Sequence, residues 1–187
     1  MTRYRDGDSR AFDVLLRRHG KPIYNFIFRS LGNPQTAEDL MQEVFLRIVK
    51  GAATYQHRAK FTTWLYTIAR NQCIDMIRRQ KHRRTYSLDA PIGDNPSGGT
   101  MVDRVKDKAP GEDRMAMDGQ FRKNLERALE GLNPDQRDVF VLREFQHLPF
   151  AEIAEIVNCP VNTVKSRMRY ALEGLRAGLT EMGESYP

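Results

Sequence analysis

The apolar residues of this 187-residue chain recur three or four positions apart through most of its length. This spacing places them on one side of an α-helix. No segment alternates apolar and polar residues over enough positions to predict a β-strand, and no internal repeat is evident. The pattern therefore predicts an all-α fold.

Three amphipathic helices are predicted in the first half of the chain. The first covers residues 9–31, and the second follows the turn Asn33-Pro34 with Thr36 as its N-cap. The third is expected to start at Thr62 or Thr63. Their apolar positions are Phe12, Leu15, Leu16, Ile23, Phe26 and Ile27, then Leu40, Met41, Val44, Phe45, Ile48 and Val49, then Leu65, Ile68, Ala69, Met76 and Ile77.

The helical pattern stops near residue 85. Residues 88–99 are rich in Pro, Gly, Ser, Asp and Asn, and charged sequence interrupted by Pro and Gly continues to about residue 117. A stretch of this length without regular structure is hard to place inside one compact domain. We therefore predict two small helical domains, at residues 1–84 and 118–187, joined by a flexible linker at residues 85–117.

The second domain contains a helix-turn-helix pattern. A helix is predicted from about Asp118 to Glu130, and Asn133 is expected to cap the next one with Pro134 in its first turn. Residues 150–167 then give a short apolar helix, a tight turn and a second helix that starts near Pro160. This arrangement is typical of proteins that place the second helix in the major groove of DNA.

The second helix of this motif divides into an apolar side and a polar side. The apolar side is formed by Val161, Val164, Met168, Ala171, Leu172 and Leu175. The polar side is formed by Asn162, Thr163, Lys165, Ser166, Arg167, Arg169 and Tyr170. Clustered cations on one helix favour binding to a DNA groove, although a helical motif of this kind also occurs without DNA binding.

The exposed side of the second predicted helix carries an acidic ridge, formed by Asp39, Gln42 and Glu43 and joined by Glu38. Asp39 and Glu43 are like charges four positions apart, which slightly destabilises an isolated helix. The ridge is therefore either a docking surface that a basic partner stabilises or an ordinary solvated face.

The third predicted helix combines cations with aromatic residues. Its outer side carries Arg70, Asn71, Ile74 and Arg78, a basic run covers residues 78–84, and Lys60, Phe61, Trp64 and Tyr66 come before. Such a combination suits an unpaired nucleic acid strand, because cations neutralise its phosphates and aromatic rings stack on its bases. The alternative is that Phe61 and Trp64 belong to the core and that the basic run is a solvated helix end.

Residues 37–47 and 61–71 resemble domain 2 of extracytoplasmic function (ECF) sigma factors, and residues 150–167 resemble sigma domain 4. The resemblance implies that Asp39, Gln42 and Glu43 bind the β′ clamp coiled coil of RNA polymerase, and that the polymerase β flap is a further contact. It implies that the melted minus-10 element of the promoter is bound by Lys60, Phe61, Trp64, Arg70, Asn71 and Arg78.

For the second domain, the resemblance implies contacts to the minus-35 element by Asn162, Thr163, Lys165, Ser166, Arg167 and Arg169. Lys165, Ser166 and Arg169 would contact base edges, while Thr163 and Arg167 would lie nearer phosphates. Because most members of the family are regulated by a dedicated anti-sigma factor, the resemblance also implies such a partner for this chain. The family's first helix usually has more residues upstream than Met1 permits, which leaves a short N-terminus or a misassigned start.

Composition narrows the alternatives. The net charge of +6 favours a polyanionic partner, and no run is apolar enough to span a membrane or serve as a signal peptide, so a cytoplasmic protein is expected. Two separated cysteines and four scattered histidines predict no disulfide, metal site, cofactor or catalytic group. The rival hypotheses are a dimeric helix-turn-helix regulator that binds duplex DNA alone and, less favoured, a helical RNA-binding protein.

Overall fold

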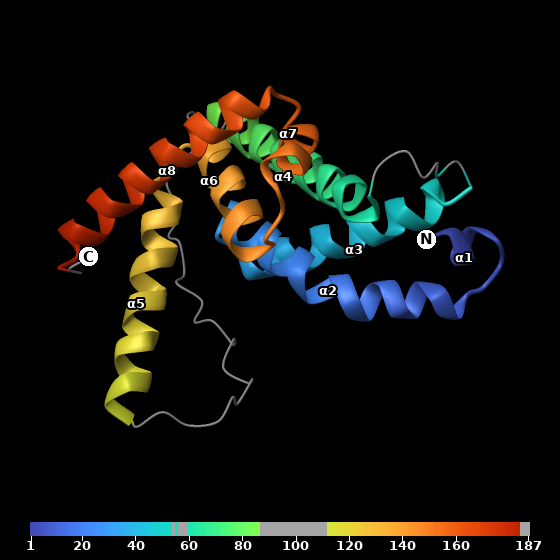
Figure 1. Ribbon diagram of the computed structural model, residues 1–187, viewed down its shortest axis with the longest axis horizontal. Helices are drawn as coiled ribbons and strands as arrows, with labels where there is room; N and C mark the ends of the chain where they lie inside the picture. Colours follow the sequence, from blue (N-terminus) through green and yellow to red (C-terminus); the bar gives the residue numbers. More distant parts are fainter. Residues whose placement is uncertain (54, 56–59, 87–111, 184–187) are drawn as a thin grey trace.

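The computed structural model describes residues 1–53, 55, 60–86 and 112–183. Within these ranges all regular secondary structure is helical, so the predicted all-α class is confirmed. The first half contains α1 (Thr2–Arg5), α2 (Arg10–Leu31), α3 (Pro34–Gly51) and α4 (Phe61–Tyr86). The second half contains α5 (Glu112–Glu130), α6 (Pro134–Phe140), the π-helix η2 (Val141–Phe145), α7 (Phe150–Val157) and α8 (Val161–Glu181) (Figure 1).

Helices α3 and α6 start at the same sequence signal. The Asn33 side-chain oxygen accepts a hydrogen bond from the Thr36 N–H at 2.9 Å, and the Asn133 side chain accepts one from the Asp135 N–H at 3.0 Å. Each Asn is followed by a proline in the first turn. The prediction that Thr36 caps the second helix was wrong, because a proline fits the first helical turn and lets Asn33 act as the N-cap.

Two helices extend into the segment predicted as a linker. Helix α4 continues to Tyr86, and α5 begins at Glu112 rather than near Asp118. The part of the predicted linker at residues 87–111 lies outside the described residues.

Helices α2, α3 and α4 pack around the core of the first half. Fully buried apolar side chains come from all three of them: Ile23, Phe26, Ile27, Val44, Ile48, Leu65 and Ala69. Leu16, Val49 and Ile77 were expected on the buried faces, and that expectation was wrong, because all three are exposed. They lie at the edges of the apolar stripes, where none of the helices described above covers them.

In the second half, α8 packs against α5, α6 and α7, and the buried core includes Val139, Val141, Leu142 and Ile153. The N-terminal part of α5 projects away from the other helices (Figure 1).

The two halves of the molecule pack against each other. Helix α4 lies along α7, and α2 contacts α5, α6 and η2 (Figure 1). Helix α4 is therefore covered on two sides. Leu65 and Ala69 are buried in the core of the first half, whereas Tyr66 and Arg70 form hydrogen bonds to residues of the second half.

Candidate nucleic-acid interfaces

The turn of the helix-turn-helix motif is tight and sterically defined. Helix α7 ends at Val157, and Asn158 adopts a left-handed conformation with φ of 51°. Asparagine tolerates this conformation better than most residues with a side chain. The Cys159 N–H then donates to the Ala154 carbonyl at 3.1 Å, and Pro160 leads into α8. The chain thus reverses between two helices within three residues.

The polar side of α8 is largely open to solvent. Exposed side chains predicted to contact DNA are Asn162, Thr163, Lys165, Ser166 and Arg169. The first ten residues of α8 contain three cations and no acidic residue. This local charge suits the phosphates that line a DNA groove.

Helix α8 is buried along one narrow stripe, formed by Val164, Met168, Ala171, Leu175 and Leu179. Val161 and Leu172 were predicted on this packing side, and that prediction was wrong: they are 37% and 50% exposed. Val161 is the first residue of the helix, and Leu172 lies beside the stripe that α5 and α6 cover.

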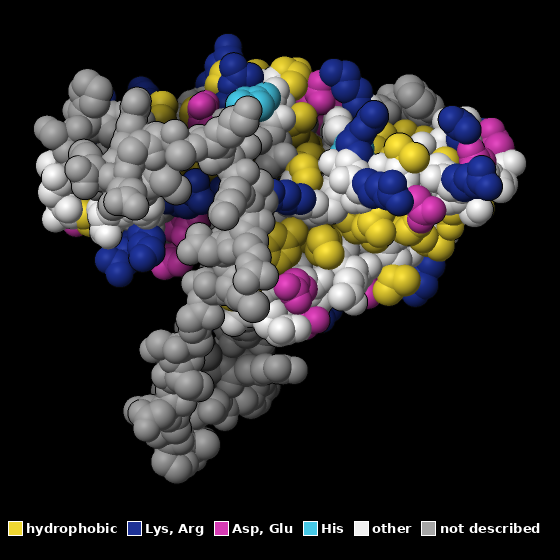
Figure 2. Space-filling view, turned by 90° about the horizontal axis from the view of Figure 1, so that it is seen from below, with side chains coloured by type: hydrophobic (Ala, Val, Ile, Leu, Met, Phe, Trp, Pro, Cys, Tyr) yellow, Lys and Arg dark blue, Asp and Glu magenta, His cyan; other side chains and the backbone are white. Residues whose placement is uncertain are grey.

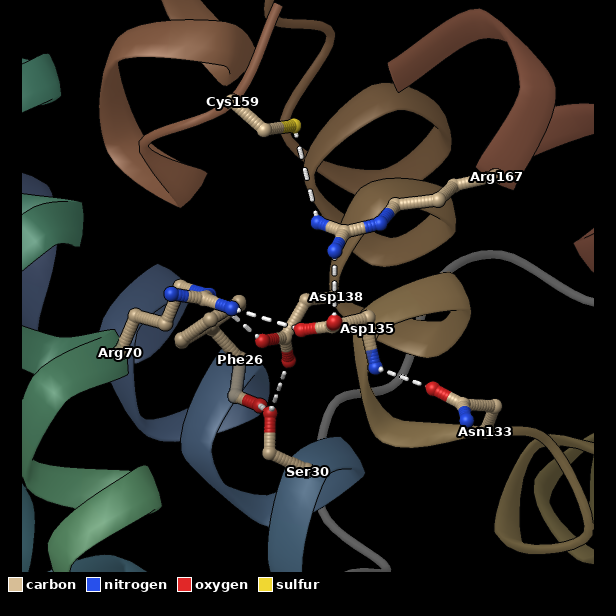
Figure 3. A network of polar contacts seen from close by, with 8 residues as sticks. All are labelled: Phe26, Ser30, Arg70, Asn133, Asp135, Asp138, Cys159 and Arg167. Carbon is tan, nitrogen blue, oxygen red and sulfur yellow. Dashed lines mark hydrogen bonds and ion pairs between the residues drawn. The ribbon is translucent and has the colours of Figure 1, made fainter. Parts of the chain in front are cut away.

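The two arginines of the polar side differ in their surroundings. Arg169 is exposed and lies 3.7 Å from Glu173 on the same helix, an ion pair that solvent weakens. Arg167 turns toward α6 instead, where its guanidinium donates to an Asp135 carboxylate oxygen at 2.6 Å (Figure 3). It also approaches the Cys159 sulfur at 3.6 Å. Arg167 is therefore engaged within the protein, contrary to the expected free position.

Helix α4 presents only part of its predicted outer side. Asn71 and Arg78 are exposed, as its periodicity predicts. Arg70 was expected beside them, and that expectation was wrong, because Arg70 is only 8% exposed. Its guanidinium donates to Asp138 at 2.8 Å and to Asp135 at 2.9 Å (Figure 3). The second half of the chain covers this side of α4.

The aromatic residues at the start of α4 form a cluster. The Trp64 ring lies 5.0 Å from Tyr55 and 6.1 Å from Phe61, and the Phe61 ring lies 5.3 Å from His19. Phe61 and Trp64 are half-buried, so they contribute to packing and still present part of their surface. Lys60 forms an ion pair with Glu152 of α7. Residues 54 and 56–59 of the preceding loop lie outside the described residues.

The acidic ridge on α3 is accessible. Asp39 and Gln42 are exposed and Glu43 is half-buried. Glu43 pairs with Arg47 at 3.2 Å, and Asp39 accepts a hydrogen bond from Gln35 at 3.5 Å. Each of the two like charges thus has a partner on its own helix, which offsets their repulsion.

Charge is distributed unevenly in the first half of the chain. Residues 1–31 contain seven basic and three acidic residues, a net charge of +4, whereas residues 34–51 of α3 have a net charge of −1. Figure 2 shows many Lys and Arg side chains on the underside of the molecule. The acidic ridge is therefore a local exception within a basic protein, as a site for a basic partner would be.

Asp135 and Asp138 of α6 were not anticipated from the sequence. Burial raises the pKa of Asp138, and the Arg70 charge opposes this increase. A buried carboxylate requires such a partner. The position of Asp138 beside apolar residues was a signal of burial, but a single sequence does not pair residues 68 positions apart.

Within the described ranges, no helix is both long and apolar enough to cross a membrane. The same residues contain no cluster of three or more His, Cys, Asp and Glu side chains that could hold a metal ion.

Comparison with known families matches two segments of this chain. The Sigma-70 region 2 model matches residues 15–83, and the Sigma-70 region 4 model matches residues 122–175. The ECF RNA polymerase sigma factor SigW of Bacillus subtilis is 34% identical over 94% of this chain and 92% of its own length. RNA polymerase sigma factor CarQ of Myxococcus xanthus is 31% identical over 97% of each chain.

Two solved structures share the fold. The sigma factor RpoE from Bartonella quintana, crystallised with the anti-sigma factor NepR, aligns with a TM-score of 0.70 at 20% identity and covers 91% of this chain and 97% of its own. CnrH, in complex with the cytosolic domain of CnrY, aligns with a TM-score of 0.62 at 22% identity, covering 95% and 92%. The family models and the sequence relatives, which decide against a stand-alone regulator and an RNA-binding protein, lead to one conclusion: the chain belongs to the ECF family of RNA polymerase sigma factors, non-enzymatic initiation factors that direct the polymerase to promoters.

Proposed function

We propose that this sigma factor uses three separate surfaces to bind core polymerase, the minus-10 element and the minus-35 element. The acidic ridge on α3 binds core RNA polymerase, the start and exposed side of α4 bind the melted minus-10 strand, and the polar side of α8 binds the minus-35 duplex. The observation that carries the proposal is the first half of α8, where the exposed cations Lys165 and Arg169 follow a tight helix-turn-helix turn and no acidic residue occurs among residues 161–170. A helix of this kind enters the major groove with its N-terminal residues against base edges.

In this proposal Lys165, Ser166 and Arg169 of α8 contact base edges, while Thr163 and Asn162, which lie nearer the first turn, contact phosphates. The Ser166 hydroxyl donates to the Asn162 carbonyl at 3.0 Å, so its oxygen remains available as an acceptor. Arg167 joins the phosphate contacts once it leaves Asp135.

On α4, Asn71 is the residue suited to an extruded base. Its amide offers both a donor and acceptors to a base edge, and it is exposed. Phe61 and Trp64 supply half-buried ring surface, and Lys60 and Arg78 supply positive charge for the flanking phosphates. Arg70 joins them once it leaves its two carboxylate partners on α6.

On α3, Asp39, Gln42 and Glu43 fit a basic coiled coil such as the one on the polymerase β′ clamp, and the second domain provides the contact to the β flap. The chain works in the cytoplasm, where polymerase and promoters are. An anti-sigma factor regulates it, as the solved complexes of RpoE with NepR and of CnrH with CnrY suggest by analogy.

The test is competition for core polymerase by the double variant Asp39→Lys, Glu43→Lys. Placing two cations against a basic partner should weaken binding to the core by roughly a hundredfold or more. Helical content should stay near that of the parent, because both positions are accessible at the surface of α3. The affinity is measured by displacement of a fluorescent sigma factor from purified core.

The matched control is Asp13→Lys, Glu181→Lys, which changes the net charge equally at two exposed positions away from the ridge. This control should bind the core as the parent does. Equal affinity of the ridge variant and the control would refute the assignment of the ridge.

A further inference from the structure

A buried carboxylate joins the two halves of the molecule. Asp138 of α6 is 7% exposed. It accepts hydrogen bonds from the Arg70 guanidinium at 2.8 Å and from the Ser30 hydroxyl at 3.4 Å (Figure 3). Both donors belong to the first half of the chain. The hydrogen bonds of Asp138 therefore exist only while the halves are packed together.

A second carboxylate extends this network to α8. One oxygen of Asp135 accepts from Arg70 at 2.9 Å, and its other oxygen accepts from Arg167 at 2.6 Å (Figure 3). One side chain thus links an arginine proposed to contact the minus-10 strand with an arginine proposed to contact the minus-35 duplex. We refer to Asp135 and Asp138 as the junction carboxylates.

Other contacts also join the two halves of the molecule at this boundary. The Tyr66 hydroxyl donates to the Gln146 side chain at 2.5 Å, and Arg137 donates to the Ser30 carbonyl at 2.8 Å. The Arg29 guanidinium lies 3.9 Å from the centre of the Phe145 ring. Asp138 is therefore shielded from water by a continuous contact rather than by a single bridge, whereas Asp135 lies at the solvent-accessible edge of the junction.

Such a junction has two favourable states, packed and separated, and intermediate states are disfavoured. In the packed state, each buried charge has its partner. In the separated state, water hydrates Arg70 and Asp138 independently. An intermediate that retains burial but loses one partner is strongly disfavoured, because an unpaired charge in a dry site is costly.

We propose that the junction carboxylates form an internal latch that holds the free sigma factor closed, by occupying in cis the Arg70 side chain that DNA phosphates would contact in the holoenzyme. The contribution to promoter binding rests on the proposed DNA-contact role of Arg70. The latch itself rests only on the geometry of the junction. Polymerase and promoter must therefore separate the halves before Arg70 reaches DNA.

The protein contains its own reporter of latch opening. Cys73 is one helical turn from Arg70 on α4 and is 2% exposed. Burial raises the pKa of its thiol, with a further contribution from the charge of Asp138. A thiol that is both buried and protonated reacts slowly with alkylating reagents. Cys159 is half-buried and serves as an internal reference.

The experiment compares alkylation of the two cysteines in the free, full-length protein. The protein is treated with N-ethylmaleimide for increasing times, quenched and digested, and the modified fraction of each cysteine is measured by mass spectrometry. In Asp138→Asn, the neutral amide leaves Arg70 without its buried counter-charge. The ratio of Cys73 to Cys159 alkylation rates should rise about tenfold or more, because removing one partner of a buried ion pair disfavours the closed state. Loss of the Asp138 charge also lowers the pKa of the Cys73 thiol, so a variant that retains this charge must show a rise as well.

Two further variants make the result decisive. Glu155→Gln removes an exposed carboxylate from the second half and should leave the ratio at the parental value. Tyr66→Phe removes a junction hydroxyl with little change of shape and should raise the ratio severalfold. Because Tyr66→Phe retains the Asp138 charge, a rise in this variant reports opening of the junction rather than a change in the Cys73 pKa, and it also decides the question if circular dichroism shows that Asp138→Asn does not fold. A parental ratio in every folded junction variant would overturn the latch.

The assay contains neither polymerase nor DNA, so it separates the latch from the proposed function. An increased Cys73 ratio in a protein whose ridge and DNA-contact variants behave like the parent would retain the latch and refute the surface assignments. Saturating holoenzyme made with Asp138→Asn should initiate at the parental rate, because the latch is open there. Slower initiation would overturn the claim that Asp138 acts only in the free protein.

Discussion

The two helices proposed to contact DNA differ in accessibility. Helix α8 presents Lys165, Ser166 and Arg169 to solvent, whereas α4 presents Asn71 but holds Arg70 against the second half. The difference follows from packing. Helix α8 lies at an edge and is buried along one stripe, while α4 is covered on two sides. The closed protein can thus offer the surface proposed to bind duplex DNA while the surface proposed to bind unpaired DNA is partly covered.

The largest expected effect tests this difference on the arginines themselves. Arg70→Ala leaves Asp138 buried without its main partner and should reduce the free energy of unfolding by about 3–5 kcal/mol. Arg167→Ala should cost less than about 1 kcal/mol, because its partner Asp135 is accessible to water and retains Arg70. Urea unfolding of both variants measures the contrast. Equal losses of unfolding free energy would mean that the two arginines contribute equally and that the burial of the Arg70–Asp138 pair adds nothing to stability.

The next prediction concerns the exposed side of α4. Asn71→Ala should weaken holoenzyme binding to a promoter whose minus-10 region is already mismatched by about 2 kcal/mol, since extruding a base costs a few kcal/mol that Asn71 helps to offset. Binding is measured by titration of a labelled promoter. The defect should largely disappear when the candidate extruded base is replaced by an abasic site.

Gln80→Ala is the control for this experiment, because it removes another exposed amide from the same helix. It should bind mismatched, abasic and fully paired promoters as the parent does. If Asn71→Ala also matched the parent on all three templates, Asn71 would not be part of the DNA-binding site.

A smaller effect is expected on α8. Arg169→Ala should reduce discrimination between cognate and altered minus-35 sequences by roughly 1–2 kcal/mol, as loss of a base-edge contact does. Arg176→Ala, also exposed but farther along the helix, should leave discrimination unchanged. Competition between labelled promoters in the presence of holoenzyme gives the measurement. A uniform loss on all sequences would instead identify Arg169 as a phosphate contact.

The sequence predicted the elements of the fold better than their mutual contacts. Periodicity correctly identified the buried stripe of Val164, Met168, Ala171 and Leu175 on α8. It also placed Asn71 correctly on an exposed side. It misplaced Arg70, because periodicity separates a polar side from an apolar side but does not show what covers the polar side. The partners of Arg70 lie 65 and 68 positions away, and a hydrogen bond between such distant residues leaves no local pattern.

Helix starts give a second lesson. The sequence Asn-Pro was correctly interpreted as N-cap and first turn at Asn133 but as a separate turn at Asn33, where Thr36 offered an alternative cap. Both signals obey the same sterics, because proline has a suitable φ and lacks only an N–H that the first helical turn leaves unpaired. The competing capping pattern, rather than missing information, caused the error.

The smallest expected effect uses these two caps to sharpen the comparison between the halves. Asn33→Ala and Asn133→Ala each remove one capping hydrogen bond and should each cost about 1 kcal/mol in urea unfolding. Only Asn133→Ala should also accelerate Cys73 alkylation, because Asn133 accepts from the N–H of the junction residue Asp135 and steadies the first turn that carries it. Thr36→Ala is the control and should be nearly neutral, since the Asn33 side chain already accepts from its N–H. A loss of about 1 kcal/mol in Thr36→Ala together with a neutral Asn33→Ala would restore Thr36 as the cap of α3.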